Sequence, residues 1–356
     1  MRILITGICG FVGSKIAQVI REHLPSATIF GIDNFSRTGA YLNKTVLESV
    51  GIQVFSGDIR LASDVDALPP ADWVIDAAAN PSVLAGLEGS TGPRQLLEHN
   101  LQSTINMLEY CRRCGAGFLL ISTSRVYSVP ILANIPVEST DDAFVLQQGR
   151  KLANGLTESG INEAFSTQAP VSLYGSTKIA SEALALEYGE AFGLPVWINR
   201  CGVLAGAGQF GRPDQGIISF WINSWLRKRS LKYIGFSGSG LQVRDCFHPR
   251  DLAQILMKQM QHSGTDRPRL VNLGGGLDRS FSLKQLSDWC ASAIGEHDVA
   301  ASDDERAYDA PWIVMDSAVA AENWDWQAET GLYEIFEETL DHAKMNPDWL
   351  KISGVD

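Results

Sequence analysis

Two polar residues four positions apart, Tyr174 and Lys178, are suited to acid–base chemistry. That spacing places both side chains on one face of a helix. A phenol with a pKa near ~10 needs help to ionise at neutral pH, and a cation one helical turn away favours the ionised form. The tyrosinate can take a proton from an alcohol while hydride leaves its carbon, and Thr123 can hydrogen-bond the reacting oxygen. Taken alone, the pair is also common on exposed helix surfaces.

A motif for a hydride-accepting nucleotide precedes these residues, at the start of the chain. Residues 2–6 form a short apolar stretch typical of a buried parallel strand, and residues 14–22 have helical spacing. The first of three intervening glycines permits a tight turn, the second lets backbone approach phosphate, and the third lets helix and strand pack closely. The N–H groups of the helix start would bind the anion. A βα turn without any ligand is the alternative. The cofactor-binding residues predicted here are Gly7, Cys9, Gly10, Phe11, Val12 and Gly13.

The residue that follows the next strand indicates whether the cofactor is NAD or NADP. Residues 28–32 read as a strand that leads to Asp33, whose carboxylate can accept hydrogen bonds from the ribose hydroxyls of adenosine. Arg37 could in principle meet the 2′-phosphate of NADP, but Asp33 would repel that phosphate. We therefore predict NAD as the cofactor, with Asn34 and Arg37 in the loop beside it.

The third and fourth strands, residues 52–55 and 73–75, are also followed by candidate cofactor contacts. Asp58, next to Ile59, falls where an acidic side chain could meet the adenine amino group. A helix cap for residues 60–65 is an equally good interpretation of Asp58. After the fourth strand, three small residues would let a flat ligand lie against the backbone: Ala77, Ala78 and Ala79.

One polar residue interrupts the apolar face of a long amphipathic helix predicted over residues 94–113. By its spacing Asn100 is buried, and a buried amide must find hydrogen-bond partners. It is either a satisfied structural residue or part of a proton relay, so we include it among the catalytic candidates.

The alternation of strands and helices predicts a doubly wound parallel α/β sheet of the Rossmann type, with ligands at the carboxyl ends of its strands. Further strands are expected at residues 117–121, 196–199 and 270–273. Residues 128–170 break the rhythm, and we interpret them as an insertion near the active site. Other helices are expected at residues 172–192, 217–226, 249–261, from 283 behind a Ser282 cap, and 332–345, the last of them.

Composition narrows the functional classes. The chain has 356 residues, 45% of them hydrophobic, and a net charge of −12. That charge argues against nucleic acid and anionic membranes as general partners. We find neither a signal-peptide pattern nor an apolar stretch long enough to span a bilayer, and therefore expect a cytoplasmic protein. The six scattered cysteines suit reduced thiols, and the six histidines do not cluster, so we predict no metal site. Cys111 and Cys114 form a C-x-x-C pair, which we interpret as ordinary helix-end residues rather than a redox centre.

Together these motifs resemble the extended short-chain dehydrogenases/reductases, specifically the NAD-dependent epimerase/dehydratase family, over nearly the whole chain. The resemblance implies a Rossmann domain plus a smaller, mostly C-terminal domain that binds a nucleotide-diphosphate sugar. Segments 209–216 and 238–245 are most similar to those of epimerases acting on a CDP-linked sugar. The substrate-binding residues it implies are Ser124, Arg125, Gln209, Gln215, Arg244 and Arg306, the two last as holders of the diphosphate.

The resemblance also implies an organisation for the chain. We assign residues 1–200 to the NAD-binding domain, with residues 242–262 returning to it, and residues 201–241 and 263–356 to the sugar-nucleotide domain. A homo-oligomer is expected, most simply a dimer that packs helices 94–113 and 174–192 across a two-fold axis.

Three departures from the family pattern bear on specificity. Asp76 stands where the family often has histidine, Ser128 replaces a usual glycine, and Val203 replaces a polar residue in many relatives. Three functions are therefore weighed: an epimerase of a nucleotide sugar, a nucleotide-sugar 4,6-dehydratase or related oxidoreductase, and a non-catalytic NAD-binding regulator. A dehydratase would require Asp-Glu directly after Thr123 to expel water, whereas this chain has Ser124-Arg125. A regulator has no need for Tyr174 together with Lys178.

The purified protein is expected to carry NAD(H) rather than NADP(H), because Asp33 would face the 2′-phosphate with like charge. Extraction of the bound nucleotide and its identification by mass spectrometry check this. Recovery of mainly NADP(H) would contradict the assignment.

Overall fold

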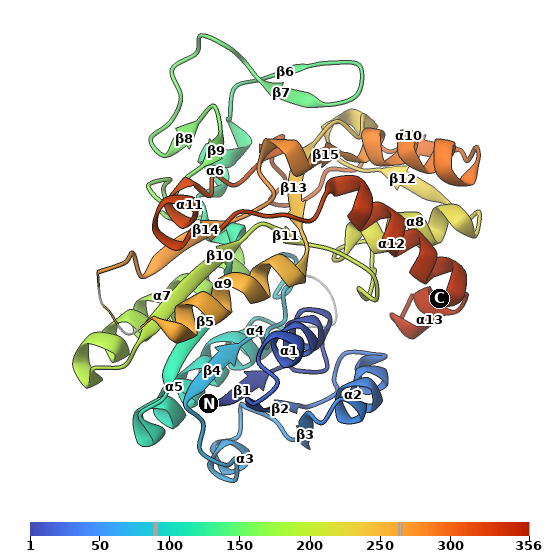
Figure 1. Ribbon diagram of the computed structural model, residues 1–356. Coiled ribbons are helices and arrows are strands. Elements are labelled where there is room, and N and C mark those ends of the chain that lie inside the picture. Colours follow the sequence, from blue (N-terminus) through green and yellow to red (C-terminus); the bar gives the residue numbers. More distant parts are fainter. Residues whose placement is uncertain (88–91, 263, 265, 356) are drawn as a thin grey trace.

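The fold is built around a parallel sheet of seven strands in the order β14-β10-β5-β4-β1-β2-β3 (Figure 1). The computed structural model describes residues 1–87, 92–262, 264 and 266–355. All seven strands begin and end within two residues of the predicted bounds. They are β1 Arg2–Thr6, β2 Thr28–Asp33, β3 Gln53–Ser56, β4 Trp73–Asp76, β5 Gly117–Thr123, β10 Val196–Cys201 and β14 Leu270–Leu273.

Helices cover both faces of the sheet, which confirms the doubly wound α/β fold (Figure 1). On one face, α1 (Phe11–His23) and α9 (Pro249–Gln261) pack in a core with strand residues such as Ile5. On the other, α5 (Ser103–Cys114) and α7 (Ser172–Phe192) share a core with strand residues such as Leu120. Because both faces are packed, polar residues that bind a ligand must lie at the strand ends.

The helix predicted over residues 94–113 is interrupted. It consists of α4 (Pro93–Leu97), a π-helical turn (Glu98–Gln102) and α5. The π-helical turn carries Asn100 with its side chain buried. Such turns often mark functional positions in helices.

A second unit packs above the carboxyl end of the sheet. Its core lies between α8 (Ile217–Leu226), α10 (Leu283–Ile294) and α12 (Leu332–Met345), and Trp221 stacks on Tyr233. Ser282 caps α10 in a capping box with Gln285, as predicted. The short strands here are β11 Val203–Leu204, β13 Val243–Phe247, β15 Ser280–Ser282 and β17 Trp312–Ile313, with β12 Leu231–Tyr233 paired to β16 Val299–Ala301.

Three segments after residue 200 pack with the large sheet, while the predicted domain division itself stays a prediction. Helix α9 returns to the sheet, in line with the assignment of residues 242–262. Strand β14, assigned with residues 263–356 to the second domain, instead pairs with β10 and extends the large sheet. Helix α11 (Ala318–Trp324) also covers this sheet, where Trp324 packs edge-on against Trp197.

The insertion of residues 128–170 packs against the second unit. It contains α6 (Val129–Ala133) and two hairpins, and its core includes Phe165 edge-on to Tyr127. Of its described residues, none lines the cavity at the carboxyl ends of the strands, so the structure does not place it directly at the predicted site. The hairpins are β6 Val137–Ser139 with β7 Phe144–Leu146, and β8 Leu156–Thr157 with β9 Gly160–Ile161.

Sequence analysis left out or misplaced several shorter helices. Helix α2 (Ala40–Ser49) was not predicted, α3 (Ala62–Asp66) begins later than expected, and α13 (Trp349–Ile352) follows the helix expected to be last. Within the described ranges, no helix is both long and apolar enough to cross a lipid bilayer.

Candidate active site

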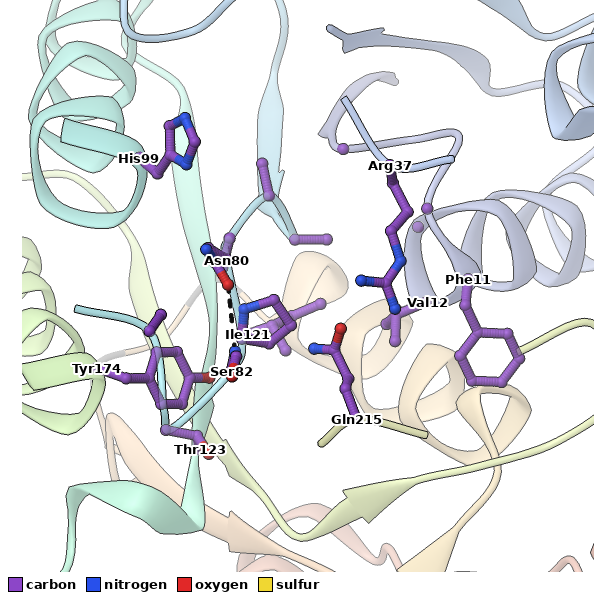
Figure 2. Close-up of a pocket in the computed structure, with 18 of the residues that line it drawn as sticks. Phe11, Val12, Arg37, Asn80, Ser82, His99, Ile121, Thr123, Tyr174 and Gln215 are labelled. Atoms are coloured by element: carbon purple, nitrogen blue, oxygen red, sulfur yellow. Dashed lines mark hydrogen bonds between the residues drawn. The ribbon is translucent and has the colours of Figure 1, made fainter. Parts of the chain in front are cut away.

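A cavity of about 820 Å³ lies where the carboxyl ends of the strands meet the second unit (Figure 2). Its walls come from the turns after β1, β2, β4 and β5, from the start of α7 and from residues 201–216. Parallel strands bring these segments together although they lie far apart in the sequence. The cavity therefore holds nearly all the residues that the sequence predicts for cofactor and substrate.

The glycine turn leaves its backbone open to this cavity. Gly7 has a φ of +61°, and a Cβ on it would lie 2.9 Å from Cα of Ala78. A Cβ on Gly13 would lie 2.4 Å from the carbonyl oxygen of Gly7, so α1 could not pack this closely on β1 with any larger residue. Within the described residues, no side chain caps helix α1. The N–H groups of its first turn are therefore available at the cavity, which Gly10, Phe11 and Val12 line. This arrangement fits the pyrophosphate of a dinucleotide.

Asp33 is held in a fixed orientation at the end of β2. Its Oδ2 accepts the N–H of Cys9 at 2.9 Å and its Oδ1 accepts the N–H of Phe35 at 2.8 Å. Burial raises the pKa of Asp33, and these backbone donors oppose the shift. Cys9 itself is fully buried and does not belong to the cavity lining in the described chain, so its part is to orient Asp33.

Arg37 lines the cavity but is engaged with the second unit. Its Nη2 donates to the carbonyl oxygen of Phe210 at 3.1 Å. Burial, together with the nearby Arg212, lowers the pKa of Arg37 to about 10. This bond directs the guanidinium toward residues 209–216, as Figure 2 shows for Arg37 and Gln215, rather than leaving it for a 2′-phosphate.

Asp58 lines the cavity beside Asn34 and Ile59. Its carboxylate accepts hydrogen bonds from Arg60 and from Nδ2 of Asn34, and Arg60 lowers its pKa to about 2. Asp58 does not cap α3, whose N-cap is Leu61, but its Oδ1 accepts the backbone N–H of Arg60 at 3.0 Å in the turn before that helix.

Three alanines after β4 form a flat wall of the cavity, and hydrogen bonds to Thr6 hold its backbone in place. The N–H groups of Ala77 and Ala78 both donate to Oγ1 of Thr6, each at 3.0 Å. These two residues and Ala79 line the cavity with methyl groups and backbone only. A planar ring can therefore approach the chain closely here.

Thr123, Tyr174 and Lys178 come together on the opposite wall. Thr123 ends β5, while Tyr174 and Lys178 lie in the first two turns of α7, 5% and 3% exposed. The Lys178 ammonium donates to the carbonyl oxygen of Ile121 at 2.9 Å. Burial raises the pKa of Tyr174 to about 12, while a hydrogen bond with Thr123 and the charge of Arg125 act in the opposite direction. Arg125 is thus one cation that favours the tyrosinate. The same role for Lys178, one helical turn from Tyr174, stays a prediction.

Asn100 lies behind this group, outside the described cavity lining. Its Oδ1 accepts the N–H of Asn80 at 2.8 Å, and its Nδ2 donates to the carbonyl oxygen of Asn80 and to Oγ1 of Thr177. The side chain thereby ties the loop after β4 to α7, one residue before Lys178. These bonds match the structural interpretation of Asn100, and the relay interpretation stays a prediction.

Three arginines converge at the other end of the cavity. Arg125 and Arg306 line it. Arg244 is half-buried and outside the described lining, and its Nη2 lies 3.0 Å from Oδ1 of Asp309. Burial and the charges of Arg244 and Arg306 lower the pKa of Arg125 to about 9. Burial likewise lowers the pKa of Arg244, and Asp309 opposes the shift. An anion would relieve this crowding of positive charge. Sequence analysis missed Asp309, which carries no motif that it recognised.

Residues 209–216 close the cavity from above. Ser82 donates to Oδ2 of Asp214 at 2.9 Å, so this segment is tied to the loop after β4. Phe210 stacks on Trp349, whose Nε1 donates to the carbonyl oxygen of Gln209 at 2.8 Å. Ser124, Gln209 and Gln215 line the cavity as predicted. The lining residues that sequence analysis missed include Ser82, His99, Arg212 and Asp214, and the bond between Ser82 and Asp214 joins segments far apart in the sequence.

Replacing Arg37 with alanine is expected to speed cofactor loss without altering the choice between NAD and NADP. The lost bond to Phe210 loosens the segment over the cavity, and a bond from a charged donor contributes roughly 1.5–3 kcal/mol, or at least about tenfold in rate. Nucleotide release followed by fluorescence measures the effect. Arg94→Ala, whose side chain is 92% exposed, is the control. Equal release rates for both variants and the parent would contradict the role.

Comparison with known proteins places this site in a family. The family described as "NAD dependent epimerase/dehydratase family" matches residues 3–274. CDP-paratose 2-epimerase of Salmonella typhi is 31% identical over 303 residues, which cover 82% of this chain and 85% of that protein. UDP-glucose 4-epimerase of Corynebacterium glutamicum is 26% identical over 95% of this chain and 94% of its own length.

Solved structures agree in fold. UDP-glucose 4-epimerase of Thermotoga maritima, solved with UDP-glucose, superposes with a TM-score of 0.78 at 19% identity, covering 98% of this chain and 100% of that one. UDP-glucuronic acid 4-epimerase of Bacillus cereus, solved with UDP-glucuronic acid and NAD, gives a TM-score of 0.75 at 22% identity over 97% of this chain and 99% of that one. The NAD predicted from Asp33 is the cofactor of the matching family. On the extent of the family match and on its fold, this chain belongs to the NAD-dependent epimerase/dehydratase family of nucleotide-sugar enzymes.

Proposed function

We propose that this protein epimerises a nucleotide-diphosphate sugar by transient oxidation and re-reduction at one carbon. The observation that carries the proposal is the arrangement of one cavity. The glycine turn, Arg306, and Tyr174 with Thr123 all line it. This arrangement offers places for a dinucleotide and for a second diphosphate, with a proton acceptor at their meeting point.

The residues of the chain would then divide the work as follows. The glycine turn and Asp33 hold NAD, which supplies a reversible acceptor for the hydride. Ionised Tyr174 removes the proton of a sugar hydroxyl, and Thr123 donates a hydrogen bond to that oxygen as it becomes a ketone. The ketosugar turns within the closed cavity and regains the hydrogen on its other face. Tyr174 returns the proton, so the centre is inverted and nothing is consumed.

The dehydratase alternative is less well supported by the residues at the site. A curated relative, dTDP-glucose 4,6-dehydratase of Streptomyces antibioticus, is 26% identical over 98% of this chain, so similarity alone does not exclude that chemistry. Expulsion of water needs an acid and a base beside the sugar. The positions after Thr123 hold Ser124 and Arg125, and Arg125 is a half-buried cation. The catalytic pair Tyr174 and Lys178, buried at the cavity, equally disfavours a non-catalytic regulator.

A CDP-linked dideoxy sugar, inverted at carbon 2, is the substrate that we favour. The support is the 31% identity with CDP-paratose 2-epimerase, and no residue of the site selects that carbon by itself. The diphosphate would lie against Arg306, with Arg125 and Arg244 adding positive charge. We expect the protein to act in the cytoplasm, without nucleic acid or membrane as partner.

Replacing Tyr174 with phenylalanine is expected to lower turnover by roughly 10²-fold or more, the scale of a lost acid–base group. The ring is kept, so folding and NAD content should match the parent. Steady-state assays over a panel of CDP-, UDP-, GDP- and dTDP-sugars measure this, and the same panel identifies the base. Undiminished turnover of the best substrate would contradict the proposed mechanism.

Replacing Arg244 with alanine is expected to weaken sugar-nucleotide binding by roughly 10–100-fold, the range for lost hydrogen bonds to charged groups. Bound NAD should stay in place because Arg244 donates to Val243 and Asp309 and to none of the predicted cofactor-binding residues. Calorimetry with the best substrate measures the affinity. Arg250→Ala removes a surface ion pair with Glu334 and is the matched control. Unchanged affinity of Arg244→Ala for every sugar nucleotide would refute the role.

We also propose that the protein is a homodimer formed by the α4–α5 segment and α7. Apolar residues stand exposed on these elements, among them Leu97, 45% exposed, and Leu173. Sedimentation at micromolar concentration should give the dimer mass, and Leu97→Glu should shift it toward monomer. Leu277→Glu, at a residue 51% exposed in the second unit, should leave the dimer intact. A parent protein that sediments as monomer would contradict the proposal.

A further inference from the structure

Lys178 carries its charge in an interior that offers it little compensation. The side chain is 3% exposed, and in the described chain its ammonium donates to a neutral carbonyl, that of Ile121. Burial accordingly lowers the pKa of Lys178. A buried ammonium needs a nearby anion to stay protonated at neutral pH. The question is which carboxylate supplies that anion.

The carboxylate of Glu182, one turn further along α7, is already bound by another cation and by a hydroxyl group. Its carboxylate accepts from Arg200 at both oxygens, with the shortest N–O distance 2.6 Å, and from Oγ of Ser122. Arg200 is itself buried. The negative charge of Glu182 is therefore balanced by a cation other than Lys178.

Asp76 is a buried carboxylate without a cation at salt-bridge distance in the described chain. It ends β4, is 0% exposed, and lies opposite Leu120 in the sheet register, one residue before the carbonyl that Lys178 contacts. Its side chain reaches the face covered by α5, where Oδ2 lies 3.0 Å from Oγ1 of Thr104. Helix α7 covers the same face, so the carboxylate and the ammonium share one buried layer.

The hydrogen bonds of Thr6 indicate that Asp76 acts as an acceptor. Oγ1 of Thr6 already accepts the N–H groups of Ala77 and Ala78, so its own proton is free for Oδ1 of Asp76 at 2.7 Å. A carboxylate that accepts such donors is favoured in its charged form. Burial raises the pKa of Asp76, and the charge of Lys178 is the largest influence that opposes this shift.

We propose that Asp76 is a positioning residue whose charge keeps Lys178 protonated, and that it thereby sets how readily Tyr174 ionises. The inference rests on the proposed function, in which Tyr174 must accept a proton. The two groups form no direct salt bridge in the described chain, so Asp76 acts across the buried layer. Asp76 stands where the family often has histidine, a residue that would not supply this negative charge.

The other ionisable groups around this pair are known from the structure. Lys178 is also influenced by Glu182 on its own helix and by Cys201 at the end of β10. Asp76 also acts on Cys111 of α5, whose thiol pKa is raised well above its usual value, chiefly by burial. Both thiols are neutral near pH 7, since burial raises the pKa of Cys201 as well. Asp76 is thus the anion left to balance Lys178.

The first test is the pH dependence of turnover in Asp76→Asn, which keeps the shape and an acceptor oxygen. Without the negative charge, Lys178 loses its proton at lower pH, so Tyr174 ionises only at higher pH. The rising limb of kcat against pH should move up by about one unit, which lowers kcat about tenfold at a fixed pH on that limb. KM and NAD content should stay within about twofold of the parent.

Asp72→Asn, just before the start of β4 in a surface ion pair with Arg2, is the matched control and should leave the profile unmoved. A proportional loss of kcat at every pH in Asp76→Asn would show a merely structural role and overturn the proposal. If that variant does not fold, Thr104→Val is used instead. It removes a hydroxyl whose one proton is shared between Oδ2 of Asp76 and the carbonyl oxygen of Asn100, and it should shift the same limb in the same direction by a smaller amount. An unshifted limb in Thr104→Val would then overturn it.

A second test needs no substrate, so it separates failure of this inference from failure of the proposed function. Thermal unfolding is compared for the parent, Asp76→Asn, Lys178→Met and the double variant. Asp76→Asn should lower Tm in the parent, where it leaves a buried cation unbalanced. In the Lys178→Met background the same change should leave Tm equal or higher, because it removes an unbalanced anion. Equal decreases in both backgrounds would overturn the proposal.

Discussion

The burial of charge is the constraint on which this site depends. Transfer of an ion from water into a protein interior costs several kcal/mol unless charge and hydrogen bonds compensate it. Here Lys178, Arg125, Arg244 and Asp33 are withdrawn from water around one cavity, and the pKa of each is shifted chiefly by that burial. Such a site is poised to bind a ligand whose own charges replace the missing water. Besides the pyrophosphate of NAD, we expect this site to bind a second anion. Because Arg125, Arg244 and Arg306 converge, our account assigns that anion to the diphosphate of the sugar nucleotide.

The same constraint explains why the second unit is fastened to the sheet at several points. Arg37 after β2 and Ser82 after β4 each donate a hydrogen bond to residues 209–216, and Phe11 of α1 packs with Phe210 and Trp349. These contacts hold residues 209–216 over the cavity, and exclusion of water by a bound ligand would strengthen the electrostatic interactions inside it. A ketosugar that must turn and be reduced again needs such closure, since an open site would release it.

Much of the fold and of the site could be predicted from the sequence, because the patterns that specify them lie in short continuous segments. The seven strands of the large sheet are short apolar stretches, and α7 is bounded by Gly193, so their bounds emerge from pattern alone. The carboxyl ends of parallel strands must meet at one edge of the sheet, and this rule alone brings together the glycine turn, Asp33, the alanines and Thr123. The NAD cofactor and the family follow from the same residues.

What could not be predicted depends on tertiary contacts. The π-helical turn at Asn100 arises where its amide bonds Asn80 and Thr177, residues distant in sequence. The bond of Arg37 to Phe210, the pairing of Arg244 with Asp309 and the place of β14 beside β10 likewise join segments far apart along the chain. The domain division and the roles of the site residues stay predictions, since geometry places a side chain without showing what it does.

The central claim is that one hydrogen leaves the sugar and returns to the same carbon. The most direct measurement uses the best substrate of the panel, deuterated at the inverted carbon, in ordinary water, with the epimer analysed by mass spectrometry and NMR. Our account predicts that the epimer retains the deuterium at that carbon. Loss of the label to solvent would instead mean deprotonation beside a carbonyl, and it would contradict the account.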